Sequence, residues 1–159
     1  MTDHVDTVLQ QWRRERPDLD VSPMAVVGRL SRVARRFDAR LARTFAEHNL
    51  DAAAFDVLAT LRRQGPPYTL SPKDLTGGAM VTSSAIAQRL NRLESQGLIS
   101  RSPSTMDGRG KCVVLTERGR TVVDQTLPDH IHAEHELLYA LDDKERQTLA
   151  ALLAKLDVP

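Results

Sequence analysis

The sequence predicts a mainly α-helical fold with one small β-hairpin, an α+β class. Aromatic residues make up only 4% of the 159 residues, so the core must be built from Leu, Val, Ile and Ala, which favours helices. Apolar residues recur at helical spacing through most of the chain. Two short β-like runs, residues 98–101 and 111–115, flank an Asp107-Gly108 pair that is typical of a hairpin turn.

Two helices are expected before residue 49. A short one covers residues 3–16, and Ser22-Pro23 is a typical start for a long one over residues 23–48. The stripe of the short helix contains Val5, Val8, Leu9 and Trp12. The apolar face of the long helix contains Leu30, Val33, Ala34, Phe37, Leu41 and Phe45, and its basic stripe contains Arg32, Arg36, Arg40 and Arg43. A solvated surface is the simpler interpretation of the basic stripe, and contact with phosphate groups is the alternative.

Five further helices are expected. Three precede the hairpin, over residues 52–64, 71–75 and 82–96, with Gly77-Gly78 as the turn between the last two. Thr116 then caps a helix that runs to about residue 139 and is kinked by Pro128. The last helix opens at Asp142, and its apolar stripe contains Leu149, Leu152, Leu153 and Leu156.

The order short helix, glycine turn, second helix and hairpin is that of a winged helix-turn-helix, whose second helix enters the major groove of DNA. In the helix over residues 82–96, Ile86, Leu90 and Leu93 share an apolar face. The opposite, polar face contains Ser84, Gln88, Asn91 and Ser95, with Arg92 at its edge. Gln and Asn can pair with adenine, Arg with guanine, and Ser with a phosphate or a base edge. Taken alone, an ordinary amphipathic surface helix would show the same pattern.

Arg109 lies at the tip of the predicted hairpin, where it can enter a narrow minor groove. An ion pair with Asp107 is the alternative, and both can hold. The predicted organisation is one structural domain: dimerisation helices over residues 1–48, the DNA-binding winged helix-turn-helix over 49–116, and further dimerisation helices over 117–159. The terminal apolar stripes are too rich for isolated helices, which predicts a two-fold homodimer.

Composition and motifs argue against several other functions. The net charge is only +1, and the single cysteine, Cys112, permits no disulfide within the chain. Neither a signal peptide nor a long apolar run is evident, so we expect a cytoplasmic protein without a membrane partner. No catalytic or phosphate-binding motif is recognisable, which predicts a protein that is not an enzyme and needs no cofactor. His130, His132 and His135 share one helix; a solvated or interface segment is favoured over a pH sensor or a metal site.

The middle third of the chain resembles the MarR family, the multiple-antibiotic-resistance regulators. The matching stretches are FDVLATLRRQG, LSPKDLTGGAMVTSSAIAQRLNRLESQGLISR and DGRGKCVVLTERGR. This resemblance implies a transcription regulator that dimerises through its N- and C-terminal helices. Each half-site of a palindromic operator would then receive one recognition helix and one wing.

The N-terminal segment, with its tryptophan followed by RRERPDLD, resembles the urate-responsive branch of that family. The resemblance implies four ligand-binding positions, which here are Trp12, Asp56, Arg89 and Arg101. Arg89 also faces the protein body on its helix, where Asp56 could hold it until an anionic ligand repels that carboxylate. Each position also has a simpler interpretation: Trp12 as an apolar anchor, Asp56 as a surface acid, and Arg101 as a phosphate contact.

These observations predict a repressor that a small urate-like anion releases from its operator. One alternative is the same regulator with another effector, such as an aromatic carboxylate or an acyclic acid like trans-aconitate. The other is a winged-helix module that binds proteins and no operator. The polar side chains at Gln88, Asn91 and Arg92 favour the DNA-binding interpretation, because a protein-docking face would be more apolar.

Overall fold

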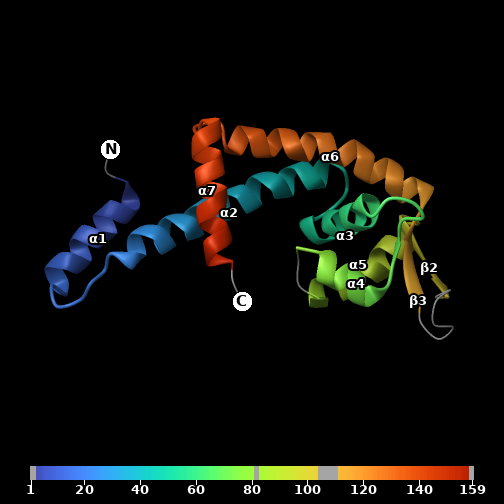
Figure 1. Cartoon of the computed structure of the whole chain (residues 1–159), viewed down its shortest axis with the longest axis horizontal. Helices are drawn as coiled ribbons and strands as arrows, with labels where there is room; N and C mark the ends of the chain where they lie inside the picture. The colour runs from blue at the N-terminus through green and yellow to red at the C-terminus, as the bar shows by residue number, and fades with distance from the viewer. Residues whose placement is uncertain (1–2, 81–82, 104–110, 158–159) are drawn as a thin grey trace. The chain divides into compact units, whose positions relative to one another are not determined.

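The structure is a computed structural model that describes residues 3–80, 83–103 and 111–157. The described chain is mostly helical with one small antiparallel sheet (Figure 1), so the predicted fold class is confirmed. In chain order the elements are α1 (His4–Glu15), α2 (Pro23–Glu47), α3 (Ala52–Arg63), β1 (Thr69–Leu70), α4 (Pro72–Gly78), α5 (Ser83–Ser95), β2 (Ile99–Pro103), β3 (Lys111–Leu115), α6 (Glu117–Leu137) and α7 (Asp143–Leu156). None of the helices in these ranges is long and apolar enough to cross a membrane.

The chain divides into two compact units, residues 1–40 and residues 41–159. In the first unit, α1 packs on the N-terminal part of α2 through a small core of Val5, Leu9 and Val21. A Cβ atom added at Gly28 would lie 3.3 Å from Cγ1 of Val5, so the two helices approach closely at this glycine.

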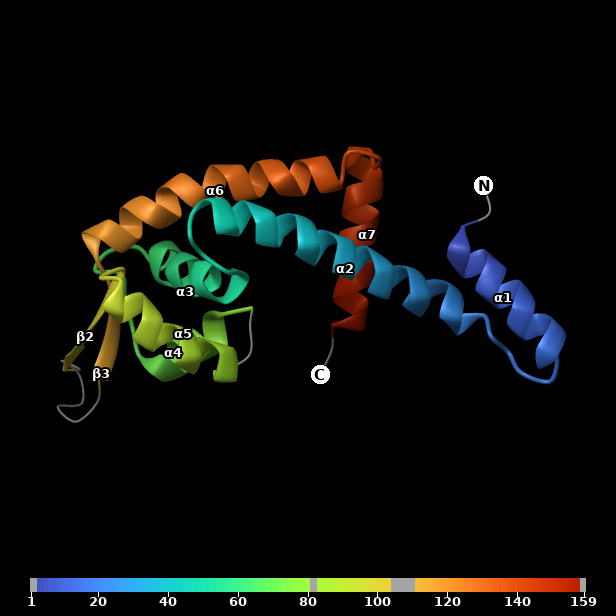
Figure 2. The same cartoon turned by 180° about the vertical axis from the view of Figure 1, so that it is seen from behind.

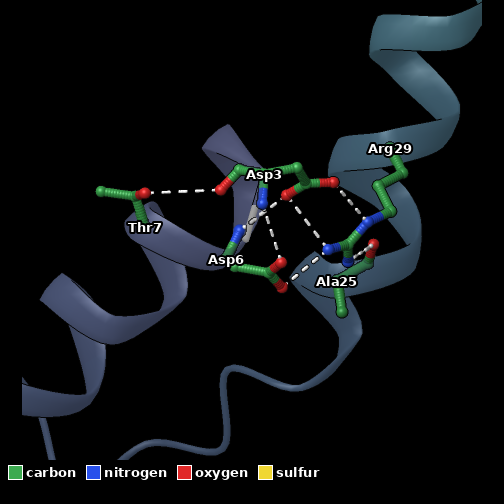
Figure 3. A network of polar contacts seen from close by, with 5 residues as sticks. All are labelled: Asp3, Asp6, Thr7, Ala25 and Arg29. Atoms are coloured by element: carbon green, nitrogen blue, oxygen red, sulfur yellow. Dashed lines mark hydrogen bonds and ion pairs between the residues drawn. The ribbon is translucent and has the colours of Figure 1, made fainter. Parts of the chain in front are cut away.

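Arg29 of α2 binds the two carboxylates at the start of α1 (Figure 3). Its guanidinium lies 2.9 Å from Asp3 and 2.7 Å from Asp6. The same two carboxylates cap α1, because each accepts the backbone N–H of the other residue. The N–H of Asp6 is the main cause that lowers the pKa of Asp3, and Arg29 is the main cause that lowers the pKa of Asp6. Both carboxylates therefore stay ionised and paired over the whole neutral range.

The core of the second unit is built around α3, which packs against α5 and α6. Val57, Leu58 and Leu61 of α3 are completely buried. The residues that surround them include Ile86, Leu90 and Leu93 of α5, Ile99 of β2, Val113 and Leu115 of β3, and Val123 of α6. The apolar face predicted for α5 is therefore confirmed as the face that packs on the body of the unit.

The sheet has three strands in the order β1–β3–β2, and both pairs are antiparallel. Figure 2 shows β2 and β3 side by side. β2 and β3 pair from Ile99↔Leu115 to Pro103↔Lys111, which makes the stem of the predicted hairpin. β1 pairs with β3 through Thr69↔Val114 and Leu70↔Val113. The sequence analysis did not predict β1, because two residues are too few to show the alternation that marks a strand.

Gly77 and Gly78 are the last residues of α4, so their prediction as the turn before α5 was wrong. The cap is Ala79, whose N–H donates to the carbonyl of Leu75. A Cβ atom at Gly78 would lie 3.3 Å from Cγ2 of Thr60, and the Gly78 carbonyl accepts a hydrogen bond from Arg63. The small residue therefore serves the close packing of α4 on α3.

Several apolar stripes stay exposed in the single chain. Leu30 and Val33, which belong to the predicted apolar face of α2, are 44% and 47% exposed. No residue of α7 is buried, and its four leucines face solvent. Pro128 lies inside α6, which continues past it to Leu137 along a curved path (Figure 1). The buried part of the second unit thus ends before α7.

Gly119 at the start of α6 should not tolerate a larger residue. An added Cβ atom would overlap the carbonyl of Leu98 and lie 2.8 Å from Cδ1 of Leu115. We expect Gly119→Ala to lower the free energy of unfolding by about 1–3 kcal/mol through overpacking. Urea unfolding measures the change.

Gly77→Ala is the matched control, because nothing lies within 4 Å of a Cβ atom at that helical position. It should raise stability slightly, by about 0.5–1 kcal/mol, through a better helix propensity. Equal effects of the two substitutions would contradict the close approach at Gly119.

Candidate nucleic-acid interface and ligand-binding residues

The candidate DNA-reading surface is the outer face of α5, whose inner face is fixed by the core. Ser84, Gln88, Asn91 and Arg92 are all exposed, as the helix periodicity predicted. Arg92 has a side chain that is 59% exposed, with its NH1 group 3.8 Å from a carboxylate oxygen of Asp51. Arg109 lies outside the described residues. The described part of the wing is the β2–β3 stem, which follows α5 directly (Figure 2).

Asn91 is bonded to the wing. Its Oδ1 accepts a hydrogen bond of 2.7 Å from NH2 of Arg101 on β2. NH1 of the same guanidinium lies 2.8 Å from Glu94, also on α5. Arg101 therefore braces β2 against α5. A bidentate pair between Asn91 and an adenine uses the same amide oxygen, which has a second lone pair for it, so the bond from Arg101 orients the Asn91 amide.

Arg89 lies on the inner edge of α5, as predicted, but its carboxylate partner is a different one. Its Nε lies 2.8 Å from Oδ2 of Asp51 and 2.9 Å from Oδ1. The expected ion pair with Asp56 is therefore corrected to a pair with Asp51. The reason is geometric: Asp51 is the N-cap of α3, so its carboxylate projects from the helix end that Arg89 can reach.

Asp56 is buried in the middle of α3 and holds the turn before α5. Its Oδ2 accepts a hydrogen bond of 2.6 Å from the backbone N–H of Met80. The residue is only 8% exposed, so the interpretation as a surface acid is wrong. Met80 follows the C-cap of α4, so this carboxylate fixes the link between the two helices of the motif.

The pKa of Asp51 lies below its ordinary value. Partial burial is the largest influence and raises it, but the N–H of Ala54, the hydrogen bond from Arg89 and the positive charges of Arg89 and Arg92 together outweigh burial. Asp51 is therefore ionised near neutral pH and attracts both arginines. Asp51 was not among the site residues predicted from the sequence. The available indication of a second role was that this predicted helix start precedes a helix, α5, with two arginines, Arg89 and Arg92, that could pair with its carboxylate.

Trp12 lies on α1 and is 44% exposed, so it is not a buried anchor of that helix. It belongs to the unit of residues 1–40, whereas Asp56, Arg89 and Arg101 belong to the unit of residues 41–159. Within the second unit, these three side chains come from α3, α5 and β2, and each already has a polar partner.

The predicted histidine cluster separates into different environments. His130 lies among the rings of Phe45 and Phe55, with its Nε2 3.2 Å from Glu134. His132 is exposed and lies 3.5 Å from Glu136. Across residues 3–80, 83–103 and 111–157, no three His, Cys, Asp or Glu side chains converge as metal ligands would. The sequence analysis missed His48, whose Nε2 lies 2.8 Å from Asp129 and ties the end of α2 to α6.

Three comparisons place this arrangement among known proteins. A model of the MarR family matches residues 48–110. The HTH-type transcriptional regulator PecS of Dickeya dadantii is 40% identical over 153 residues, which cover 96% of this chain and 92% of PecS.

Solved structures show the same likeness over longer stretches than the family model. BpsR of Bordetella bronchiseptica, whose DNA binding is regulated by 6-hydroxynicotinic acid, has a TM-score of 0.77 and 28% identity; the match covers 84% of this chain and 94% of BpsR. A mutant MarR from E. coli in complex with operator DNA has a TM-score of 0.75 and 27% identity, over 87% of this chain and 96% of that one. With a winged helix-turn-helix fold and a relative this similar over nearly its whole length, the chain belongs to the MarR family of DNA-binding transcriptional regulators.

Proposed function

We propose that this protein is a homodimeric repressor that binds a palindromic operator and is released from it by a small anionic ligand. The observation that carries the proposal is the two-sided α5. Its apolar face is buried against α3, and its opposite face presents Gln88 and Arg92. Because the buried face fixes the rotation of α5, the polar face is held ready for the major groove.

Dimerisation is supported by the apolar surface that the single chain leaves uncovered. A 14-residue helix without one buried residue, as α7 is, would be marginal in water. The exposed stripes on α2 and α7 include Leu30, Val33, Leu152 and Leu156. A second copy of the chain would cover them and place the two copies of α5 about one turn of DNA apart.

A ligand that is flat and anionic is supported by the side chains available to it. Arg89 and Arg101 of the second unit each offer a guanidinium group, and the family resemblance adds Trp12 as the aromatic residue. The BpsR neighbour responds to 6-hydroxynicotinic acid, an aromatic acid. Urate and aromatic carboxylates are therefore the first effectors to test, and urate is the one that the four matching residue types favour.

The proposed release acts on three carboxylates: Asp51 at the N-cap of α3, Asp56 within α3, and Glu94 of α5. An anion near Arg89 and Arg101 would compete with Asp51 and Glu94 for these arginines. Its charge would also repel Asp56, which holds the N–H of Met80 in the turn before α5. Both effects loosen α5 and its wing. The ligand shifts the equilibrium only by its differential affinity for the two states, typically about 1–3 kcal/mol.

Footprinting on the DNA beside the protein's own gene tests the repressor proposal. We expect a two-fold symmetric protected region with half-sites about one helical turn apart, because each protomer inserts one α5. Gln88→Ala should reduce discrimination between operator variants by about 1–3 kcal/mol. Thr121→Ala, a change of a polar residue on α6 away from the reading face, is the control and should leave discrimination unchanged.

A stable monomer in sedimentation at micromolar concentration would contradict the dimer. Gln88→Ala binding every operator variant as the wild type does would show that the reading face is assigned incorrectly.

Titration calorimetry with urate tests the ligand residues. We expect Trp12→Phe and Arg101→Ala each to weaken urate binding, Arg101→Ala by about tenfold or more, because it removes a charge-assisted hydrogen bond. Arg62→Ala is the control, because Arg62 is a half-buried arginine of α3 whose ion pair is with Asp124 of α6. Equal urate affinity in all four proteins would place the ligand elsewhere. If the wild type binds 6-hydroxynicotinic acid and not urate, the effector is an aromatic carboxylate.

Asp56 should support both stability and DNA binding without any ligand. Asp56→Ala leaves the N–H of Met80 without this acceptor, and the loss of a buried hydrogen bond costs about 1–3 kcal/mol of unfolding free energy. Asp56→Asn keeps an oxygen acceptor and should cost less. Urea unfolding and operator titration measure both effects. An Asp56→Ala protein as stable and as tightly bound as the wild type would show that this bond does not hold the turn.

A further inference from the structure

We propose that Asp51 is a positioning residue for operator specificity: its carboxylate sets the orientation of α5 by holding Arg89, and it attracts Arg92 away from non-specific phosphate contacts. This inference rests on the proposed insertion of α5 into the major groove. It assigns a role in sequence discrimination to a residue outside the four predicted ligand positions and outside the reading face.

The first step is that one carboxylate serves two elements. Oδ1 of Asp51 accepts the backbone N–H of Ala54 at 2.9 Å and so caps α3. Both carboxylate oxygens also lie within 2.9 Å of Nε of Arg89, in the middle of α5. The start of the most buried helix is thereby joined directly to the recognition helix.

The second step is that the carboxylate is held in a fixed place. The chain turns between α2 and α3 at Asn49, which has a positive φ of 58°, and the N–H of Leu50 donates to the carbonyl of Phe45. Phe45 stacks on Phe55 of α3, with ring centroids 4.7 Å apart. His48 adds the 2.8 Å contact with Asp129 of α6. Asp51 therefore projects from a corner that is anchored to three helices.

The ion pair between Asp51 and Arg89 controls the orientation of α5. Asp56 fixes the turn before α5 through Met80, whereas Asp51 acts on the body of α5 through Arg89. Gln88 is the adjacent residue on the same helix. The buried apolar face sets the rotation of α5, and the Asp51–Arg89 pair restrains the small rotations that remain. Because a small rotation of α5 about its axis moves Gln88 across the base edges, the pair refines the register of reading.

The Asp51 carboxylate has opposite effects on operator specificity and on non-specific DNA affinity. A carboxylate beside a DNA-facing helix repels phosphates and draws Arg92, whose NH1 lies 3.8 Å from it. Removing the negative charge would favour contacts with any DNA backbone while it loosens the orientation of α5. The expected result is a lower specificity ratio and no loss of non-specific affinity.

The variant that isolates the charge is Asp51→Asn. Asn caps a helix about as well as Asp, so α3 keeps its N-cap while the ion pair is lost. Two DNA fragments of equal length serve as probes: the one that the wild type protects in footprinting, and a scrambled version. We expect the ratio of the two affinities to fall about tenfold, the size of effect expected for a charge-assisted hydrogen bond, with unchanged or tighter binding to the scrambled fragment.

Asp124→Asn is the matched control. Asp124 forms an ion pair of 2.8 Å with Arg62 at a similar exposure to that of Asp51 and Arg89, but it lies on α6. The Asp124→Asn substitution removes the same negative charge and should leave the ratio of the affinities for the two DNA fragments unchanged. Arg89→Gln and the Asp51→Asn/Arg89→Gln double variant complete a cycle. Because Asp51 acts on Arg89 as well as on Arg92, Asp51→Asn should lower the ratio less in the Arg89→Gln background than in the wild type, so the cycle should be non-additive.

Thermal unfolding identifies a variant that has simply lost its fold. Asp51→Ser, which also caps a helix without a charge, replaces Asp51→Asn if that protein is unfolded. A folded Asp51 variant with the ratio of the wild type overturns the inference, and so do strictly additive effects in the cycle. A wild type that does not distinguish the two fragments refutes the proposed function itself, and the inference with it.

Discussion

The burial of α3 is the constraint on which the DNA-reading unit depends. Eight of its twelve residues are buried, and they include the acid Asp56. Because α3 contacts α5 and α6, it fixes both the proposed recognition helix and the helix that leads toward the C-terminus. Two carboxylates connect the buried α3 to α5. Asp51 at the N-cap of α3 forms an ion pair with Arg89 in the body of α5, and Asp56 accepts a hydrogen bond from Met80 in the turn before it.

Much of this architecture could be predicted from the sequence, because caps and periodicity are local. Thr116 and Asp142 were expected as N-caps and both are, and the buried face of α5 followed from residue spacing alone. The partner of Arg89 did not follow. Asp51 and Asp56 are five residues apart, which is about 140° around a helix. Their spacing therefore shows that they lie on different sides of α3, but it does not show which carboxylate Arg89 can contact. Only the packing of α5 on α3 shows which of the two the guanidinium meets. The bond between Asn91 and Arg101 was missed for a related reason: it joins a helix to a strand, and no periodicity within either element encodes it.

The uncovered apolar stripes have a different physical status from the rest of the surface. Scattered apolar residues are normal on any protein, but α7 exposes all of its leucines on one short helix. The two sides of α1 also differ: Val5 and Leu9 are buried on α2, and Trp12 on the same helix remains half-exposed. The terminal helices thus have apolar surface that their own contacts leave uncovered, whereas the core around α3 is complete. That division separates the proposed DNA-reading part of the chain from the part that the proposed dimer would use.

The bridge from Arg101 to Asn91 and Glu94 has an evolutionary consequence. A single guanidinium joins the strand of the wing to the proposed recognition helix, so positions 91 and 101 are not free to vary independently. A descendant that acquired a new base preference through position 91 would also alter the support of its wing. New operator specificities in this lineage should therefore arise through paired replacements, and the preferences at helix-read and wing-read bases should be correlated rather than additive.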